Sequence, residues 1–494
     1  MIPQKSFLQK KIDKGIHLLN KKNFTKATEI FNYLIKNNQT KIIGLFFLGI
    51  IQIQKKNSLL AEEYLLKVLQ INKNHEDANL NLAFIYFGEK KYEKSTIYLD
   101  KVIEINRNNL NAIYHKGLIF FFIKEYDNAI RYFEICNNLN STFFYPYLNL
   151  GHIYLRTGNF KKAILNYTKV LEIDPSNYTA KFNLSWCYFS TFDFDNGFKF
   201  YENRKEKTLP NEKLNKINEE LKSKEWSGQN LDNKSILILS EQGIGDSIQF
   251  FRYLFWLKDK YKVKIIFYID KKLVNLFKDS PFTLISSLSD IKDIDYYQHL
   301  LSLPGIYYKE KKKFYKQISF IKVNEDINKN WCKKLYDYKK PIVALNWQGD
   351  QNFGSDQTRS IPLSFFQDIL KINTFKFISL QKGFGSEQIE LNNFSNDLLD
   401  LSNEIDMGNN AFEDTVAILK NVNLLITSDT AIAHLAGTMS IKTYLLLEYN
   451  PEWRWHIEKK FKCFYPKINI IQQNNPNNWN EVFKQLKENL NNGN

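Results

Sequence analysis

Cysteine is scarce in this chain of 494 residues, and no long apolar segment is present. The four cysteines are Cys136, Cys187, Cys332 and Cys463, and their wide spacing excludes a Cys-x-x-Cys metal site and a disulfide framework. The most apolar run, residues 42–51, is half as long as the roughly 20 residues that a membrane-spanning helix needs. The N-terminal segment has no apolar signal core. We therefore expect a cytoplasmic protein, with at most a peripheral contact to the inner face of the membrane.

Several common catalytic signatures are also missing. The chain has no Walker loop, no Gly-x-Ser-x-Gly elbow and no Cys-His nucleophile pattern, which excludes the enzyme classes that depend on them. Histidines and cysteines do not cluster with metal-ligand spacing. Two Asp-x-Asp pairs, Asp293/Asp295 and Asp193/Asp195, mimic the motif of metal-dependent sugar transferases, but the second lies within the helical repeats described below. We expect no metal and no cofactor.

The net charge of +15 raises the question of an acidic partner. A basic surface can attract nucleic acid, an acidic protein or an anionic membrane. Lysine is abundant throughout the chain, however, and no Lys/Arg cluster with interleaved aromatic residues stands out. We expect no nucleic-acid partner.

A period of 34 residues runs through the first two hundred positions. Two sets of small residues repeat with this spacing and lie twelve residues apart. The first set is Gly15, Gly49, Ala83, Gly117, Gly151 and Ser185, and the second is Ala27, Ala61, Ser95, Ala129, Ala163 and Gly197. Large residues follow each set at a fixed offset. They are Leu18, Gln52, Tyr86, Phe120, Tyr154 and Tyr188 after the first set, and Phe31, Leu65, Leu99, Phe133, Tyr167 and Tyr201 after the second.

Two short helices pack closely only where small residues occupy their crossing point, and large residues one turn away fill the space beside it. The pattern resembles the tetratricopeptide repeat, with Gln52 as the one clear departure. Six such repeats predict a solenoid whose groove binds a protein or an extended peptide. The alternative is a solenoid that only mediates self-association or pads the rest of the chain.

Beyond residue 234 the pattern changes to buried strands that alternate with helices. The predicted strands are 235–240, 264–269, 341–347, 376–381, 397–402, 423–429 and 443–449, with helices near 362–372, 412–421 and 430–439. Continuous apolar strands of this kind form parallel sheets, so we expect an α/β body of two Rossmann-like lobes.

The predicted fold class is therefore multidomain, an all-α solenoid followed by this α/β body. The predicted domains are a solenoid at 1–205, a linker and capping helix at 206–234, lobes at 235–330 and 340–477, and a final helix at 478–494. Helical patterning within the linker appears at 210–224, and we expect Trp226 to pack the two halves together.

The first candidate site follows the strand at 235–240. Gly243 and Gly245 lie between this strand and a helix, where glycines let backbone N–H groups approach an anion. Asp246 begins that helix and faces the cleft at the carboxyl end of the sheet, where a carboxylate can act as a general base. Equally, Asp246 can simply cap its helix.

The second candidate site follows the strand at 423–429. Asp429 and Thr430 end that strand and begin a helix, and the N–H groups of Ala431 and the next residue can hold a diphosphate. His434, one turn further along, can bind the same group. A lone histidine on an apolar helix is, however, more often a packed structural residue.

Three further residues are weaker candidates for binding a nucleotide sugar. Arg359, in a polar loop after a strand, offers a bidentate fork to a phosphate, and Lys382 lies just past another strand end. Asp414 begins a helix, where a carboxylate can bind ribose hydroxyls or cap the helix. For each, a surface or capping role is the alternative.

Several strings of the second half together resemble bacterial tetratricopeptide-repeat proteins that carry a heptosyltransferase-like domain of glycosyltransferase family nine. These strings are SILILSEQGIGDSIQFFRYL, HLLSLPG, LNWQGDQNFGSDQTRSIPL, FISLQKG and DTVAILKNVNLLITSDTAIAHLAGTMSIKTYLLLEYNPEWRW. The resemblance implies a GT-B fold that needs no metal, with the nucleotide-sugar donor in the C-terminal lobe. The architecture is also similar to that of protein O-GlcNAc transferases.

The resemblance also implies roles for individual residues. Asp246 matches the aspartate of the family's Gly-Asp turn, the candidate base. Asp429, Thr430 and His434 match the segment that faces the donor diphosphate, and Ala431 stands where the family commonly has glycine. The sequence thus favours an enzyme that transfers a hexosyl or heptosyl group to a protein, glycan or lipopolysaccharide precursor. The alternative is a non-catalytic adaptor with a degenerate transferase-like body.

Overall fold

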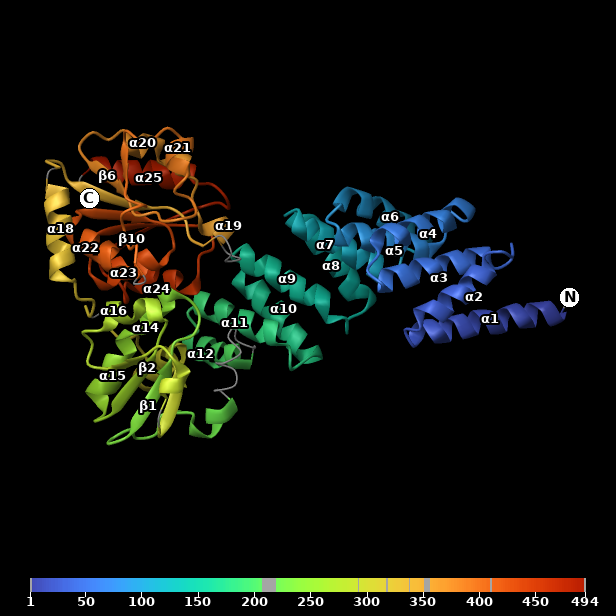
Figure 1. Ribbon diagram of the computed structural model, residues 1–494, viewed down its shortest axis with the longest axis horizontal. Coiled ribbons are helices and arrows are strands. Elements are labelled where there is room, and N and C mark those ends of the chain that lie inside the picture. Colours follow the sequence, from blue (N-terminus) through green and yellow to red (C-terminus); the bar gives the residue numbers. More distant parts are fainter. Residues whose placement is uncertain are drawn as a thin grey trace. The chain divides into compact units, whose positions relative to one another are not determined.

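The computed structural model describes residues 2–492 except 207–218, 292, 317–318, 337, 351–355 and 409–410. The chain divides into two compact units, residues 1–180 and residues 181–494 (Figure 1). In the described residues, the first unit is helical and the second contains two sheets. The boundary between the units falls inside the sixth predicted repeat. No helix among the described residues is both long and apolar enough to cross a membrane.

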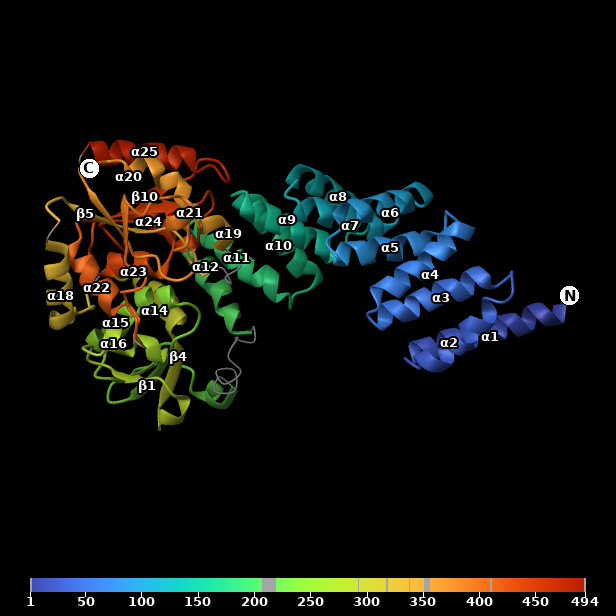
Figure 2. The same cartoon turned by 45° about the horizontal axis from the view of Figure 1, so that its top comes forward.

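The predicted repeats fold as pairs of helices joined by short turns (Figure 2). The pairs of the first unit are α1 (Ile2–Asn20) with α2 (Phe24–Leu34), α3 (Lys41–Gln54) with α4 (Ser58–Ile71), α5 (Glu76–Gly88) with α6 (Tyr92–Ile105), α7 (Leu110–Phe122) with α8 (Tyr126–Leu139), and α9 (Phe144–Arg156) with α10 (Phe160–Ile173). This arrangement confirms the helical solenoid predicted for the N-terminal half of the chain.

Small residues lie where the two helices of a pair cross, as the sequence predicted. A Cβ atom added to Gly151 would lie 2.5 Å from the ring of Tyr167, and one added to Gly117 would lie 2.7 Å from the ring of Phe133. Both rings are fully buried. Close packing of a large ring against a bare backbone therefore determines the helix spacing.

The first sheet of the second unit is wholly parallel, with the strand order β3-β2-β1-β4. Its strands are β1 (Ser235–Leu239), β2 (Lys264–Tyr268), β3 (Thr283–Ile285) and β4 (Tyr296–His299). Helices α14 (Ile244–Phe250), α15 (Arg252–Lys260), α16 (Val274–Phe277) and α17 (Leu303–Lys311) belong to the same segment. The strand order reverses at β1, because β2 and β3 extend the sheet on one side of β1 and β4 is added on the other. The loop after β1 therefore lies at a topological switch point.

The second sheet is also wholly parallel, with the order β10-β9-β8-β5-β6-β7. Its strands are β5 (Ile342–Asn346), β6 (Lys376–Ser379), β7 (Leu398–Asp400), β8 (Leu424–Thr427), β9 (Thr443–Leu447) and β10 (Ile468–Gln472). The nearby helices are α18 (Glu325–Tyr336), α19 (Asp356–Arg359), α20 (Gln367–Leu370), α21 (Gln388–Leu391), α22 (Glu413–Asn421), α23 (Ala431–Thr438), α24 (Trp453–Phe461) and α25 (Asn480–Asn491). The switch point lies between β5 and β8.

Side chains of the second sheet alternate between two cores. Val343 and Leu345 face a core that includes α25, whereas Ile342 and Ala344 face a core shared with α22, α23 and the first sheet. One continuous apolar core therefore joins the two sheets. The predicted α/β content with parallel sheets is confirmed, although β3, β4 and β10 were not predicted.

The last helix pair, α11 (Tyr178–Ser190) and α12 (Phe194–Tyr201), packs into this same core. Phe189 stacks on Trp453 with ring centroids 4.1 Å apart, and Tyr201 meets the same indole edge-on at 5.9 Å. Phe198 lies against Gly305, where an added Cβ would approach its ring to 3.1 Å. This helix pair therefore packs as a part of the α/β unit.

The segment between α12 and β1 contains the predicted linker helix and Trp226. The predicted helix at 210–224 lies largely outside the described residues. Trp226 is buried, and its ring packs against Trp256 while its backbone N–H donates to Tyr297. These contacts fix Trp226 against the first sheet and α15, in the same apolar core that includes Phe189 and Tyr201 of the last helix pair.

Candidate functional site

Asp246 lies in the first turn of α14, at the carboxyl end of the first sheet. Its Oδ2 accepts a hydrogen bond of 3.0 Å from the backbone N–H of Gly243, so the capping role considered from the sequence is present. Its Oδ1 accepts a second hydrogen bond, of 2.6 Å, from Nη1 of Arg454. The side chain is 13% exposed, so this ion pair is largely screened from water. Asp246 thus connects the start of α14 to the first turn of α24.

Arg454 lies at the centre of a group of charged side chains that also includes Asp246, Glu452 and Asp429 and is called the polar cluster below. Besides Asp246, its guanidinium faces the Glu452 carboxylate, with Nε 2.9 Å from Oε2, and it lies over the rings of Phe250 and Trp453. Burial raises the pKa of Glu452 to about 8 against the lowering effect of Arg454, and the nearby Asp246 and Asp429 also raise it. The cluster therefore combines several carboxylates with few cations and retains a proton near neutral pH.

Asp429 follows β8 at the switch point of the second sheet. Burial raises its pKa, while a hydrogen bond from Trp455 and the positive charges of Arg359 and Arg454 lower it. Arg359 and Arg454 therefore both lie close enough to Asp429 for their positive charges to lower its pKa. The two sequence-predicted motifs, around Asp246 and around Asp429, are brought together at facing ends of the two sheets, where α14 packs against α23.

His434 lies on α23 and is 4% exposed. Its ring stacks on Trp455 at 4.9 Å, and its Nδ1 is 3.1 Å from the hydroxyl of Tyr465. A Cβ added to Gly245 would lie 2.8 Å from Cδ2 of this ring, so the glycine permits the close approach of α14. Burial, and then the nearby arginines, keeps the pKa of His434 well below its ordinary value. The imidazole is therefore neutral and firmly packed.

Thr430 and Ala431 begin α23. The hydroxyl of Thr430 does not cap this helix but donates to Oδ1 of Asn346, at the end of β5, over 2.9 Å. The amide of Asn346 in turn donates to Gln381, after β6, over 2.9 Å. These contacts tie together the carboxyl ends of β5, β6 and β8. At the start of α23 the N–H of Ala433 donates to the carbonyl of Thr430 over 3.0 Å, whereas the N–H groups of Ala431 and Ile432 precede the first hydrogen bond of the helix.

Lys382 and Asp414 belong to a separate cluster around Asp406. The Lys382 ammonium donates to the carbonyls of Ile405 and Asp406. The Asp414 carboxylate accepts hydrogen bonds of 2.7 Å from the indole of Trp331 and from the backbone N–H of Asp406. Asp414 therefore does not cap its own helix. These contacts stabilise the turn before α22, and the two residues are not brought to Arg454 or Asp246 in the geometry described.

Neither Asp-x-Asp pair forms a metal site in the described chain. Asp293 is exposed, and Asp295 accepts hydrogen bonds from Ser235 and Lys234. Among the described residues, no group of three or more His, Cys, Asp and Glu side chains is placed to hold a metal ion. Metal independence itself stays a prediction.

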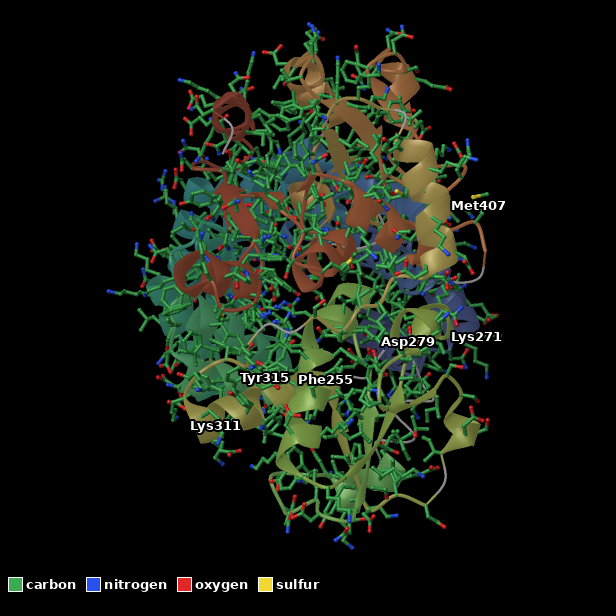
Figure 3. All side chains as sticks on the ribbon, turned by 90° about the vertical axis from the view of Figure 1, so that its left-hand side faces the viewer. Phe255, Lys271, Asp279, Lys311, Tyr315 and Met407 are labelled. Carbon is green, nitrogen blue, oxygen red and sulfur yellow. The ribbon has the colours of Figure 1, made fainter. Side chains whose placement is uncertain are left out.

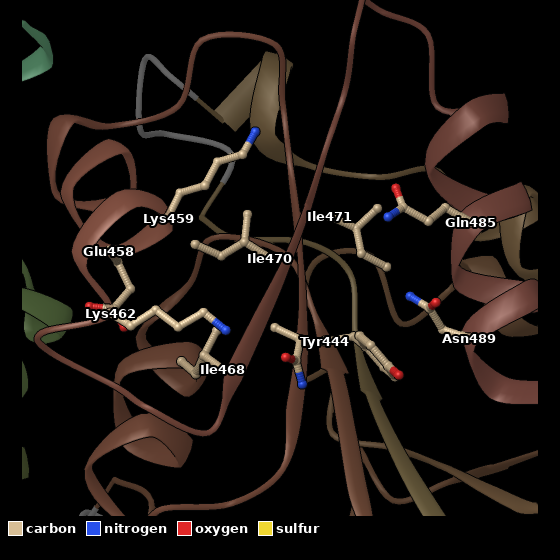
Figure 4. A pocket seen from close by; sticks show the side chains of 10 residues that line it. Tyr444, Glu458, Lys459, Lys462, Ile468, Ile470, Ile471, Gln485 and Asn489 are labelled. Carbon is tan, nitrogen blue, oxygen red and sulfur yellow. The ribbon is translucent and has the colours of Figure 1, made fainter. Parts of the chain in front are cut away.

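Two cavities lie apart from the polar cluster. One of about 320 Å³ follows the edge strand β10 between α24 and α25 and is lined by Tyr444, Glu458, Lys459, Lys462, Ile468, Asn469, Ile470, Ile471, Gln485 and Asn489 (Figure 4). The other, of about 240 Å³, is lined by residues that include Glu413 and Asp279. Asp279 is labelled in Figure 3. None of the described residues that line them is a sequence-predicted site residue. Because ligands of open parallel sheets bind at switch points, we assign the site to the polar cluster.

The sequence did not single out Arg454, Glu452, Trp455 or Tyr465. Its one usable signal was the unusual Trp453-Arg454-Trp455 triplet after β9, in which an arginine stands between two aromatic residues. Trp453 stacks on Phe189, Arg454 pairs with Asp246 and Trp455 stacks on His434, and periodicity alone does not assign these contacts. A buried pair such as Asp246 with Arg454, 208 positions apart, becomes visible only in the fold.

Comparison with known proteins concerns the repeats. Residues 76–109, 110–143 and 145–177 match models of the tetratricopeptide repeat. Repeats of this kind present extended binding surfaces, which indicates a role in binding protein or peptide partners. None of the curated proteins matches the chain.

Solved structures similar to part of this chain include the following three. A MamA protein is 23% identical, with 33% of this chain and 88% of that chain covered and a TM-score of 0.31. YrrB, described as a TPR protein with an unusual peptide-binding site, is 16% identical, with 36% and 91% covered and a TM-score of 0.32. PilF of Pseudomonas aeruginosa is 16% identical, with 40% and 90% covered and a TM-score of 0.37.

Proposed function

We propose that the chain is a metal-independent glycosyltransferase that moves a sugar from a nucleotide-sugar donor to a hydroxyl group. One observation carries the proposal. The Asp246 motif and the Asp429–His434 motif, found independently in the sequence, meet at the switch points of two parallel sheets within one compact unit. In this proposal the two sheets are the lobes of a GT-B body in the cytoplasm.

The proposed reaction uses few protein groups. Asp246 takes the proton of the acceptor hydroxyl while the acceptor oxygen attacks the anomeric carbon. The bond from that carbon to the diphosphate oxygen breaks, and the nucleoside diphosphate leaves with the bonding electrons. The N–H groups from Ala431 onward, together with Arg359, stabilise the charge that develops on the diphosphate, which is the role a metal ion has in other transferases.

The solenoid would recruit the acceptor. Its repeats indicate binding of a protein or peptide, and its fusion to the α/β unit keeps a bound chain close to the site. A protein, a glycan or a lipopolysaccharide precursor fits the proposal.

A screen of nucleotide sugars by thermal stabilisation tests donor binding, and the stabilising donor is then assayed for transfer with and without EDTA. We expect Asp246→Asn to bind donor and to lose about 10²–10⁴-fold in turnover, the range for loss of a general base. Asp368→Asn, which changes the same charge at an exposed ion pair with Lys487, is the control and should retain full turnover. Activity lost in EDTA and restored by manganese would contradict the metal-free mechanism.

A non-catalytic adaptor is the second candidate. Its supporting observation is that the Asp246 carboxylate is already engaged by Gly243 and Arg454, so it is not a free base in this structure. An adaptor would bind nucleotide or partner without turnover. Stabilisation by a donor, with no transfer or donor hydrolysis detectable in wild type, would favour it over the enzyme.

A further inference from the structure

The guanidinium of Arg454 is held in place but is only partly used. Nη1 donates to Asp246 and Nε faces Glu452, whereas Nη2 has no acceptor among the residues that the structure describes. Packing against Phe250 and Trp453 fixes the plane of the group. The side chain is 11% exposed. A rigid, partly satisfied guanidinium is suited to binding a bidentate anion.

Asp246 uses only half of its carboxylate for this pair. Oδ1 meets Arg454, while Oδ2 is occupied by the N–H of Gly243. The aspartate therefore presents one oxygen to a group that has room for two. A diphosphate carries more charge and more oxygens, so it is the stronger ligand for the same guanidinium.

The surroundings of Arg454 also point to an anion. Its charge, with that of Arg359, acts on Asp429 and His434 on either side of the start of α23. The first N–H groups of this eight-residue helix begin there. An anion bound between Arg454 and this helix start would meet positive potential from both sides.

We infer that Arg454 is a diphosphate-binding residue, and that Asp246 occupies its guanidinium until the diphosphate of the donor displaces the carboxylate. This inference rests on the proposed function for the identity of the ligand. It also implies that the donor binds before the acceptor is deprotonated, because Asp246 is released as a base only when the donor is bound. A site without donor then holds no free base.

The test measures binding of inorganic pyrophosphate to the full chain by calorimetry. Asp246→Asn removes the competing charge and should tighten binding about tenfold, whereas Arg454→Gln should weaken it at least about tenfold. The controls Asp368→Asn and Lys487→Gln change the same charges at an exposed ion pair and should bind like wild type. Unchanged or weaker binding by Asp246→Asn would overturn the inference, as would normal binding by Arg454→Gln.

Loss of Arg454 leaves Asp246 and Glu452 without their shared cationic partner, so Arg454→Gln can fail to fold. Arg454→Lys retains the charge without the fork and should bind pyrophosphate several-fold more weakly than wild type. Wild-type affinity in this variant also overturns the inference. If no sugar transfer is found but the pyrophosphate pattern holds, the transferase proposal fails alone. If transfer is found and Asp246→Asn binds pyrophosphate like wild type, the transferase proposal stands. The inferred displacement of Asp246 from Arg454 by the diphosphate is then wrong.

Discussion

A missing side chain at position 245 allows two helices to meet. Gly245 on α14 lies against the His434 ring on α23, and that ring is confined by Trp455 and Tyr465. A methyl group at 245 would need space that a stacked, buried ring cannot yield. The glycine expected from sequence to admit a ligand therefore also serves the packing of α14 on α23.

Replacement of Gly245 by alanine should destabilise the α/β unit by about 1–3 kcal/mol, the usual cost of overpacking. The expected readout is a lower midpoint in urea unfolding of the full chain. Gly408→Ala is the matched control, because an added Cβ there meets nothing within 4 Å. Equal midpoints for the two variants would contradict the packing described.

The raised pKa of Glu452 makes stability depend on pH. Its carboxyl group has a pKa of about 8 when folded and an ordinary value when unfolded, so the folded state binds the extra proton between these values. Stability from this group is complete at low pH and is lost as pH rises through about 8. Glu452→Gln removes this titration and keeps the shape of the side chain.

We therefore expect Glu452→Gln to melt near wild type at pH 4, below the ordinary pKa of the carboxyl group, and at least about 3 °C above it at pH 8.5. Scanning fluorimetry at both pH values measures the effect. Glu325→Gln, which removes an exposed carboxylate paired with Lys420, should show no such pH-dependent difference. A difference in melting temperature that does not grow between pH 4 and pH 8.5 would mean that the pKa of Glu452 is not raised in the folded state.

The candidate site was only partly predictable at this scale. Asp246 and Asp429 follow strands and precede helices, and chain order alone predicts that such residues gather at sheet edges. Arg454 has no such signal, since its role depends on a partner in the other sheet's segment. Lys382 and Asp414 occupy similar positions after strands, yet local hydrogen bonds to the turn at Asp406 hold both side chains.

Each helix pair turns at one residue with positive φ, and these residues keep the 34-residue period. They are Lys22, Lys56, Lys90, Lys124, Gly158 and Phe192, with φ between 56° and 71°. Only the fifth pair has the glycine that this conformation favours. A side chain in the left-handed region costs of order 1 kcal/mol, so the other turns carry strain.

Lys90→Gly should accordingly slow hydrogen exchange in α5 and α6, and Gly158→Lys should speed it in α9 and α10. The expected change is about 1 kcal/mol or less for the first, because glycine also gains freedom in the unfolded chain. Exchange followed by mass spectrometry resolves the two helix pairs within the full chain. Faster exchange after Lys90→Gly would show that the lysine side chain stabilises the turn by other contacts.

Elements with a strong period were predictable, and elements without one were not. The helix pairs and the seven apolar strands follow from spacing and from buried runs. The strand β4 ends in Gln298 and His299, whose buried side chains bond to Trp226 and face Glu241, so it lacks an apolar pattern. The edge strand β10 alternates exposed and buried positions and includes polar residues.

At the scale of the whole molecule, the sixth helix pair belongs with the α/β unit. Arg204, just after α12, is buried and bonds to Glu241 and Ser302, while Phe189 covers Trp453. Without this pair, an aromatic surface and a buried carboxylate of the α/β unit would be exposed. The compact unit accordingly begins at residue 181.

Truncation should separate the two units at this point. We expect fragments 1–180 and 181–494 each to unfold cooperatively, and fragment 206–494 to aggregate or to lack a sharp transition. Circular dichroism and size-exclusion chromatography measure both properties. A fragment 206–494 as stable as 181–494 would show that α11 and α12 are dispensable for the α/β unit.

The stacking of Phe189 on Trp453 has a consequence for how such a chain can change in length. Trp453 adjoins Arg454, so the last helix pair contacts the segment that holds the proposed site, whereas the earlier pairs share one packing scheme. Insertion or deletion of whole 34-residue blocks before residue 178 would change the length of the solenoid surface that binds a partner. Such changes would leave the residues of the proposed site in place. Selection on partner choice and selection on the proposed site can thus act on separate stretches of the same gene.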